Sequence, residues 1–231
     1  MRNHLKRIAA PPSWDIDRAD GKYTIRPKAG AHPLAESLPL GMLIRDELKL
    51  ASTLAEARKV LSNNIIQVDG KRRTEYRFSV GLFDVISIPK GSSQSTYRMF
   101  IDKKGRLILR EIALKESASK ICKVTGKTAF SGNKIQLHLH DGKNIITEEK
   151  VKVGDSVLIT LPKFEIKEVL PLVSKAVVFL MGGKHQGEVG TLKEVSGNEA
   201  TFVKEGKEIK TAKKYLFVVG KDKPLLEIKT E

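Results

Sequence analysis

Residues 39–71 read PLGMLIRDELKLASTLAEARKVLSNNIIQVDGK and carry the clearest local folding signals of the chain. Apolar residues at 42–44 predict a first short helix with charged residues on its other side. Thr53 and Glu56 predict a capping box, in which the hydroxyl and the carboxylate each bond a backbone N–H at a helix start. The sequence therefore predicts a second helix directly after the first.

The same stretch then changes from helical to strand periodicity. Residues 65–68 are predicted to form a strand, and Asp69-Gly70 is the pair typical of a two-residue type I′ hairpin turn. Another strand is predicted at 84–88, ending at Pro89. We therefore predict a compact α+β unit over residues 40–89.

Residues 1–39 contain five of the nine prolines and little periodicity. This composition predicts an extended arm that has no core of its own and lies against another surface. Trp14 either stacks on a nucleic-acid base or holds the arm against a domain, and the sequence leaves both roles open.

The remainder of the chain is predicted to be mostly β, with one short helix at 112–119. Residues 90–172 are expected to form a small central β-domain with strands at 97–101, 107–112, 121–124, 135–139, 144–147 and 156–161. Residues 173–231 are expected to form a small barrel with strands at 177–180, 188–192, 200–204 and 216–219. The predicted fold class is thus a multidomain α+β, mostly β chain.

Positive charge dominates the 231 residues, with 42 Lys and Arg against 27 Asp and Glu, a net charge of +15 and a pI near 9.8. Every part of the chain shares in the excess, which favours long contact with a polyanion over one docking patch. No apolar stretch is long enough to cross a bilayer, and no secretory signal begins the chain. A single cysteine, Cys122, agrees with a reducing compartment, so we expect a cytosolic protein.

A metal site is not expected. His138 and His140 would share one face of a strand beside Asp141, but zinc sites need three or four ligands, often with cysteines. These histidines are therefore interpreted as polar strand positions, and Asp141-Gly142 as a second hairpin turn.

Catalytic motifs are also missing from the sequence. The glycines of 182–187 resemble a phosphate loop, but Glu188-Val189 stands where Lys and Ser or Thr are required. No nucleophile elbow or zinc-protease helix is present. Asp84 is expected to be structural and to cap the turn after Gly81. No enzyme activity, metal or cofactor is predicted.

Several cations lie where backbone donors are also expected to be free. The start of the helix at Thr53 offers N–H groups and a positive dipole, and Lys49, Arg58 and residues 71–73 are its basic neighbours. For Arg58 or Lys59 alone a solvated helix face explains the charge as well. The combination favours RNA phosphate contact.

Two segments resemble known RNA-binding modules. Residues 39–49, 55–60 and 68–71 resemble the αL RNA-binding domain of ribosomal proteins, pseudouridine synthases and tyrosyl-tRNA synthetases. Residues 177–190, VVFLMGGKHQGEVG, are similar to a KOW motif of ribosomal proteins and elongation factors. With HLKRIAAP at 4–11, Trp14 and FDVISI at 83–88, the order of the pieces resembles the archaeal and eukaryotic ribosomal small-subunit protein S4e family.

This resemblance implies an αL domain, a central β-domain and an SH3-like KOW barrel, all bound to small-subunit rRNA. A non-catalytic structural constituent of the cytoplasmic ribosome is therefore expected, with the 5′ domain of the rRNA and neighbouring ribosomal proteins as partners. No membrane, DNA or second copy of the chain is expected. The lack of a basic tail after Glu231 favours the archaeal form.

Two rival functions come from other classes. A pseudouridine synthase needs an Asp in an Arg-Leu-Asp context, and residues 105–108, GRLI, lack it. A KOW elongation factor would not explain the αL segment or the arm.

The chain departs from the family pattern at Pro12, where the arm often has a basic residue. It also has His185-Gln186 in place of the Asn that usually precedes the motif glycine, and Glu188 where a basic residue is common. No phosphate contact is therefore assigned to Pro12. Neutralising Arg72 and Arg73 together is expected to weaken rRNA binding without altering folding. The full set of expected RNA contacts is Arg2, Lys6, Arg7, Trp14, Arg45, Lys49, Thr53, Arg58, Lys59, Lys71, Arg72, Arg73, Gly183, Lys184 and Gly187.

Overall fold

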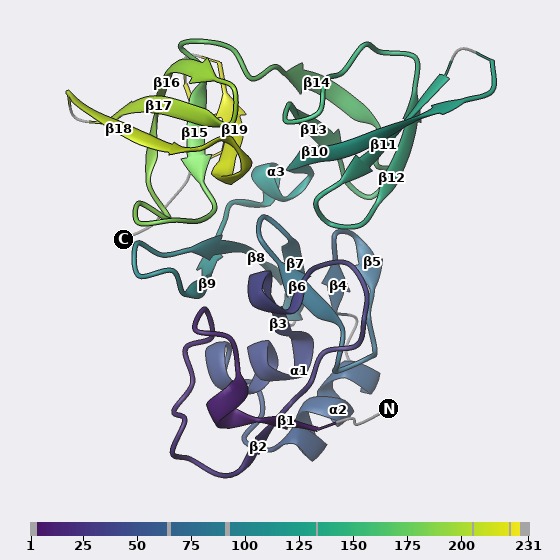
Figure 1. Ribbon diagram of the computed structural model, residues 1–231. Coiled ribbons are helices and arrows are strands. Elements are labelled where there is room, and N and C mark those ends of the chain that lie inside the picture. Colours follow the sequence, from purple (N-terminus) through teal and green to yellow (C-terminus); the bar gives the residue numbers. More distant parts are fainter. Residues whose placement is uncertain are drawn as a thin grey trace. The chain divides into compact units, whose positions relative to one another are not determined.

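The structure is a computed structural model that describes residues 4–63, 66–90, 93–132, 134–204, 206–221 and 223–226 (Figure 1). Its contacts divide the chain into two compact units. The first, the N-terminal unit, comprises Met1–Phe100 and Arg106–Ser117, and the second, the C-terminal unit, comprises Ile101–Gly105 and Ala118–Glu231. Each unit is described by itself.

The N-terminal unit combines short helices with one larger sheet. Its helical elements are η1 (Arg7–Ala9), η2 (Leu34–Glu36), α1 (Leu40–Met42), the π-helical turn η3 (Leu43–Glu47), α2 (Leu54–Asn63) and α3 (Leu114–Ser117). Its strands are β1 (Leu5–Lys6), β2 (Tyr23–Thr24), β3 (Ser37–Pro39), β4 (Gln67–Val68), β5 (Lys71–Arg72), β6 (Ser79–Gly81), β7 (Val85–Lys90), β8 (Ser93–Ile101) and β9 (Leu107–Glu111). The five-stranded sheet has the order β5-β4-β7-β8-β9, while β1 pairs with β2 and β3 with β6.

Both predicted helices and the first hairpin are confirmed. The first helix continues from α1 into the π turn. The second, α2, begins directly after Thr53, the first residue of the capping box. Asp69 and Gly70 have φ values of 53° and 73°, as a type I′ turn requires. The strand before the turn is shorter than predicted, since β4 covers only Gln67–Val68, and residues 64 and 65 lie outside the described residues.

The last strand of the predicted α+β unit does not stop at its proline. In β7, Pro89 pairs with Gln94 of β8, and the strand continues to Lys90. The expected division between residues 89 and 90 therefore falls inside a β-hairpin. The sheet of the N-terminal unit also takes in β8 and β9.

The core of the N-terminal unit lies between the helices and this sheet. Its largest fully buried apolar side chains include Leu40, Leu61, Phe83 and Phe100. Arg98 of β8 is buried among them, and its guanidinium donates to the backbone oxygen of Glu116 at 2.9 Å. Burial, partly offset by the charges of Glu116 and Asp69, lowers the pKa of Arg98 to about 10, so the side chain is charged at neutral pH.

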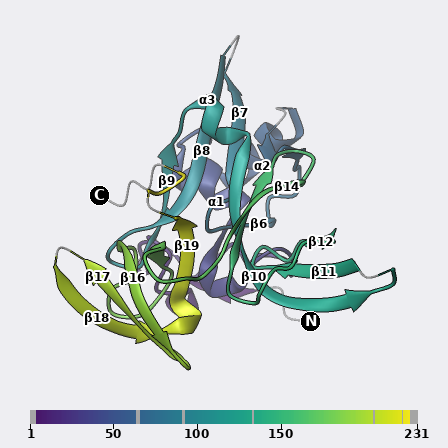
Figure 2. The same cartoon turned by 90° about the horizontal axis from the view of Figure 1, so that it is seen from above.

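The C-terminal unit contains two five-stranded sheets, with the orders β12-β11-β10-β13-β14 and β18-β17-β16-β15-β19. The strands of the first are β10 (Ser119–Phe130), β11 (Lys134–Leu139), β12 (Asn144–Thr147), β13 (Ser156–Thr160) and β14 (Ile166–Leu170). The second contains β15 (Val177–Leu180), β16 (Val189–Ser196), β17 (Glu199–Lys204), β18 (Lys207–Ala212), the turn η4 (Lys213–Tyr215) and β19 (Leu216–Gly220). Figure 2 shows the β10–β11 hairpin projecting from its sheet.

Sequence patterning located most of these strands but missed β14 and β18, and it predicted only the first part of β10. The second predicted hairpin is present between β11 and β12, but its loop spans residues 140–143 and is longer than a two-residue turn. The core of the first sheet consists of Cys122, Val124, Leu137, Leu139, Val151, Val157 and Ile159, and Phe179, Phe202 and Phe217 are buried in the second. The chain is thus mostly β, as predicted.

Candidate nucleic-acid interface

The N-terminus of α2 is closed by its own side chains. Glu56 N–H donates to Thr53 Oγ1 at 3.2 Å, and Glu56 Oε2 accepts from the N–H groups of Ser52 at 2.8 Å and Thr53 at 3.3 Å. The predicted capping box is therefore confirmed. Glu56 thus competes with a phosphate for the N–H groups of Ser52 and Thr53, and the phosphate contact expected at Thr53 stays a prediction.

Two arginines beside α2 lie over aromatic rings. The Arg58 guanidinium is 4.2 Å from the ring centroid of Tyr76, and that of Arg73 is 4.4 Å from the ring of Phe78. These contacts connect α2 and the β4–β5 hairpin to the segment before β6. In the sequence Tyr76, Phe78 and Val80 alternate with polar residues, a pattern typical of a strand that gives no signal for this role. Cation–π stacking orders each guanidinium before any ligand arrives.

The hairpin arginines also contribute to the fold. Arg72 Nη2 donates to the backbone oxygen of Ser62 at 3.0 Å and so ties β5 to α2. With Arg73 packed on Phe78, neutralising the two arginines would disturb the unit. From these contacts we expect the double change to lower stability as well, in place of the sequence-based expectation that folding is unaltered.

Other expected contacts in the N-terminal unit differ in exposure. Arg45 Nε and Nη2 bond the two carboxylate oxygens of Asp46 at 2.6 and 2.9 Å, an interaction that raises the pKa of Arg45. Lys6, Lys49, Lys59 and Lys71 are exposed. Arg2 lies outside the described residues.

Arg7 is a structural residue. It is 8% exposed, and its Nη1 donates to the backbone oxygens of Asp17 and Asp20 and to Asp20 Oδ2, the last at 2.9 Å. These acceptors lie within the arm itself and hold Nη1 there, so the burial of Arg7 argues against the expected RNA contact.

Trp14 is likewise buried, with 3% of its surface exposed, and its indole N–H donates to the backbone oxygen of Ser37 at 2.7 Å. No ring face is left for a base. Of the two roles left open by the sequence, the structure supports the one in which Trp14 holds the arm.

A buried pair fixes the far end of the arm. His32 Nε2 lies 2.9 Å from Asp84 Oδ2, and the same carboxylate oxygen accepts from Gly81 N–H at 2.9 Å. A Cβ on Gly81 would come within 2.4 Å of the His32 ring, so the close approach requires glycine. The capping role predicted for Asp84 is confirmed. The arm thus lies against the N-terminal unit and contributes His32 and Trp14 to the core of that unit.

The turn between β15 and β16 contains the remaining expected contacts. Gly183 and Lys184 are exposed, whereas Gly187 is buried. Glu188 accepts from His185 Nδ1 at 3.2 Å and pairs with Lys204 at 3.1 Å. The acidic residue that departs from the family pattern is thus bound by partners within the C-terminal unit.

Gly187 approaches protein backbone. Its φ is +80°, and a Cβ would lie 2.7 Å from the backbone carbonyl of Asp102. The chain itself fills the space at the Cβ position of Gly187, which argues against the expected close approach of RNA there.

Replacing Gly187 by alanine is therefore expected to lower the free energy of unfolding of the C-terminal unit by about 2 kcal/mol, from left-handed strain and the backbone clash. Urea unfolding measures this change, and Gly197→Ala is the control, because Gly197 also has a positive φ but nothing within 4 Å of its Cβ position. Equal losses from the two variants would show that strain alone, and not the close approach, matters at Gly187.

The candidate metal ligands have other partners. His138 lies 2.8 Å from Asn144 Oδ1 and 2.8 Å from Thr128 Oγ1, which confirms it as a polar strand position. His140 lies beyond the end of β11 and packs edge-on against Phe217 with ring centroids 5.2 Å apart, so the two histidines do not share a site.

Asp141 could join Cys122 and His140 around a cation, since their ligand atoms all lie within 4.8 Å of one another. However, Asp141 Oδ2 is 2.9 Å from Lys120 Nζ and 2.8 Å from Lys143 Nζ. Two ammonium groups at the carboxylate would repel a metal ion. The residues present here do not fit a metal.

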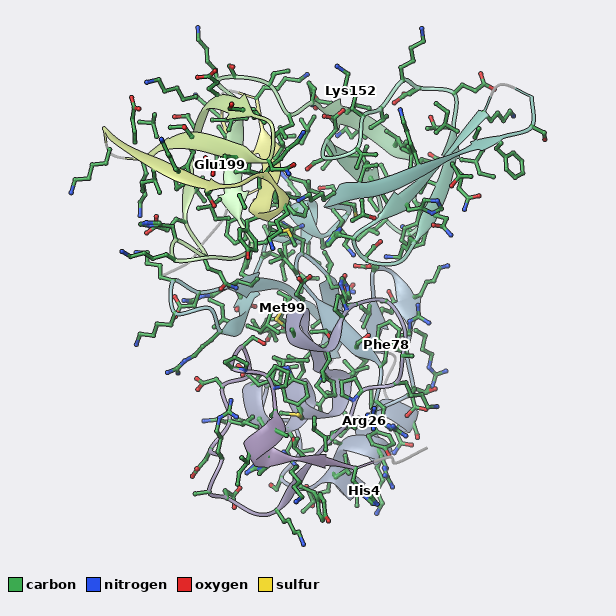
Figure 3. All side chains as sticks on the ribbon, viewed as in Figure 1. His4, Arg26, Phe78, Met99, Lys152 and Glu199 are labelled. Atoms are coloured by element: carbon green, nitrogen blue, oxygen red, sulfur yellow. The ribbon has the colours of Figure 1, made fainter. Side chains whose placement is uncertain are left out.

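Nitrogen-tipped side chains project from both units (Figure 3). Among the helices that the structure describes, none has the length and hydropathy of a membrane-spanning segment. Exposed cations on α2 and its hairpin, on a basic and mostly β chain, are features typical of nucleic-acid-binding proteins.

Comparison with known proteins agrees with this class. The sequence model of ribosomal family S4e matches residues 93–166, and that of the RS4NT domain matches residues 1–35. Small ribosomal subunit protein eS4 of Methanosphaera stadtmanae is 42% identical, with 98% of this chain and 96% of that protein covered. The eS4 protein of Methanothermobacter thermautotrophicus is 38% identical at the same coverage. The chain therefore belongs to ribosomal protein family S4e.

A solved structure extends the comparison to the fold. The crystal structure of the 30S ribosomal protein S4e from Thermoplasma acidophilum has a TM-score of 0.70 and 33% sequence identity to this chain. The match covers 80% of this chain and 95% of the chain in that crystal structure.

Proposed function

We propose that this chain binds the 5′ domain of small-subunit rRNA through phosphate and shape contacts. As a member of family S4e, it is a structural constituent of the small ribosomal subunit and not an enzyme. It works in the cytoplasm as part of the ribosome, with rRNA and ribosomal proteins as its partners.

The proposed division of labour follows the family resemblance. Residues 40–89 act as an αL RNA-binding domain, 90–172 as a central β-domain and 173–231 as a KOW barrel with an SH3-like fold, and residues 1–39 form the arm. The β7–β8 hairpin spans the boundary between the first two of these domains. The helix pair and hairpin of the first segment and the five-stranded sheet of the last support these assignments.

One observation carries the proposal: cations on α2 and on the adjacent hairpin are exposed while aromatic and backbone contacts hold several of them in place. Arg58 stacks on Tyr76, and Arg72 bonds Ser62. Ordered cations lose less conformational entropy on binding phosphates than free ones. The residues that remain proposed RNA contacts are Arg2, Lys6, Arg45, Lys49, Thr53, Arg58, Lys59, Lys71, Arg72, Arg73, Gly183 and Lys184.

We expect the full chain to prefer the isolated 5′ domain of small-subunit rRNA over an unrelated RNA of equal length, and to retain the preference as salt rises. Shape-specific contacts survive screening better than a diffuse attraction between polyions. Filter binding across a salt series measures both affinities. If the two affinities are equal and fall together as salt rises, the chain binds RNA only as a nonspecific polycation and the proposal is wrong.

Neutralising Lys49 and Lys59 as Lys49→Gln and Lys59→Gln is expected to weaken rRNA binding and to reduce the slope of log affinity against log salt by about 2, one for each lost phosphate contact. Both lysines are exposed, so the unfolding midpoint should stay unchanged. The charge-preserving pair Lys49→Arg and Lys59→Arg is the matched control. A slope that is identical in all three proteins would remove these lysines from the interface.

A further inference from the structure

The C-terminal unit contains a groove for which the fold alone gives no role. It has a volume of about 820 Å³ and is lined by Lys123, Val124, Thr125, Val153, Gly154, Asn198, Ala212, Lys213 and Lys214. One wall is the start of β10 with the 153–154 turn, and the other is η4 with the ends of β16–β18. Lys152 and Glu199, next in sequence to Val153 and Asn198, are labelled in Figure 3 and mark the two walls.

Hydrogen bonds fix both walls before any ligand binds. Gly154 N–H donates to Val124 O at 2.9 Å, and Val124 N–H donates to Asp155 O at 2.9 Å, so the turn is clamped to β10. The Asp155 carboxylate accepts from the N–H groups of Lys152 and Leu172, each at 2.9 Å. The volume falls within the range of preformed ligand sites.

The opposite wall is tied to the first. Lys123 Nζ donates to the backbone oxygen of Lys214 at 2.6 Å, and Lys213 N–H donates to Asn198 O at 2.8 Å. A rigid groove loses little entropy on binding, which favours a functional site over a gap left by loose packing.

The lining selects for an anion with an apolar face. Three of its residues are lysines, and none of the described lining residues carries a carboxylate. Within the described part of the chain, Lys213 has no acidic partner, and Lys214 Nζ lies 4.8 Å from the centroid of its neighbour's ring, Tyr215. Val153 is 49% exposed, although it is a large apolar residue.

We propose that this groove binds one unpaired nucleotide of rRNA, with the base against Val153 and Ala212 and the phosphate beside Lys213 and Lys214. The inference rests on the proposed rRNA binding and makes the C-terminal unit a second point of contact. Bases that leave a helix expose a planar apolar face, which protein surfaces recognise together with the flanking phosphates.

The matched pair Val153→Cys and Val173→Cys tests the proposal. Val173 belongs to the same unit, is 53% exposed and does not line the groove. The native Cys122 is buried, so a photoactivatable thiol reagent attaches only at the new cysteine, with the wild-type chain as a blank. Crosslinks to small-subunit rRNA are mapped by primer extension on the complex of the full chain.

We expect the label at residue 153 to crosslink to one discrete, unpaired stretch of the rRNA, and the label at 173 to give no discrete site. Val153→Asp should weaken rRNA binding about tenfold, the effect of losing one stacked base, and Val173→Asp by less than about twofold. Both valines are half exposed, so neither change should alter the unfolding midpoint.

Equal, scattered crosslinks from both positions would overturn the proposal. So would crosslinks from residue 153 to a neighbouring ribosomal protein in the assembled subunit, which would assign the groove to an acidic peptide. If the wild-type chain prefers rRNA while Val153→Asp binds as well as Val173→Asp, the proposed nucleotide site in the groove is wrong and the proposed function stands. If the wild-type chain shows no preference, both fail.

Discussion

Replacing Asp141 by asparagine is expected to lower the free energy of unfolding of the C-terminal unit by about 3–5 kcal/mol, the cost of leaving a buried charge without its partner. Lys120 of β10 has no exposed side-chain surface, and its Nζ lies 2.9 Å from Asp141 Oδ2. Asparagine preserves the shape of the side chain and removes only its charge. The loss therefore measures the electrostatic role.

The two partners should not be equally important. Lys120→Met leaves Asp141 with Lys143, whose Nζ is 2.8 Å away and whose side chain is partly exposed. This variant should lose about half as much stability as Asp141→Asn. The double variant Lys120→Met/Asp141→Leu removes both buried charges and should approach wild-type stability, since an apolar pair can replace a buried ion pair.

Urea unfolding, with amide hydrogen exchange in β10 and β13 to identify the unit, measures these changes. Glu148→Gln is the control, because its pair with Lys134 is 3.6 Å long and lies on the surface, where a loss of less than about 0.5 kcal/mol is expected. Wild-type stability of Asp141→Asn would contradict the argument.

The same pair predicts a pH dependence. Burial alone would raise the pKa of Asp141, but the positive charges of Lys120, Lys143 and His140 and a hydrogen bond from Lys143 outweigh it and hold the pKa well below its usual range. A lowered folded-state pKa stabilises the protein at pH values above the unfolded pKa, near 4, and this stability is lost as the pH falls further. The stability difference between wild type and Asp141→Asn should therefore shrink below about pH 4.

Local sequence signals predicted the elements that depend on neighbouring residues or on an apolar run. The capping box of α2, the Asp69-Gly70 turn and the apolar β15 depend on residues adjacent in sequence, and each is present. The missed strand β18 lies at the edge of its sheet and reads KEIKTA, with no buried residue. The second half of β10 is exposed at almost every position. Such strands are held by backbone hydrogen bonds, so their sequences show no alternation of apolar and polar residues from which a strand could be predicted.

The candidate site shows the same limit for charge. The sequence gives the number of cations but does not show which acceptors they contact. Arg7 bonds acceptors that are 10 and 13 residues away, and Lys120 bonds Asp141, which is 21 residues away. These partners meet only through tertiary structure. Some of the 42 Lys and Arg side chains are therefore bound inside the fold, and fewer of them are available to RNA than the composition indicates.

Trp14→Ala is expected to destabilise the N-terminal unit by about 3–5 kcal/mol, the usual cost of truncating a buried tryptophan. The side chain is 3% exposed, and its N–H bonds the oxygen of Ser37, the first residue of β3. Trp14→Phe keeps most of the apolar volume but leaves that buried oxygen unpaired, so a smaller loss of about 1–3 kcal/mol is expected.

Tyr23→Ala is the control, because Tyr23 is an aromatic residue of the same arm with 51% of its surface exposed, and we expect a loss below about 1 kcal/mol. Urea unfolding measures stability, limited proteolysis reports release of the arm, and filter binding reports rRNA affinity. A buried anchor predicts that early cleavage of the arm accompanies the lost stability. A Trp14→Ala protein that unfolds like wild type but binds rRNA poorly would instead assign Trp14 to base stacking, because only the RNA contact would then have been removed.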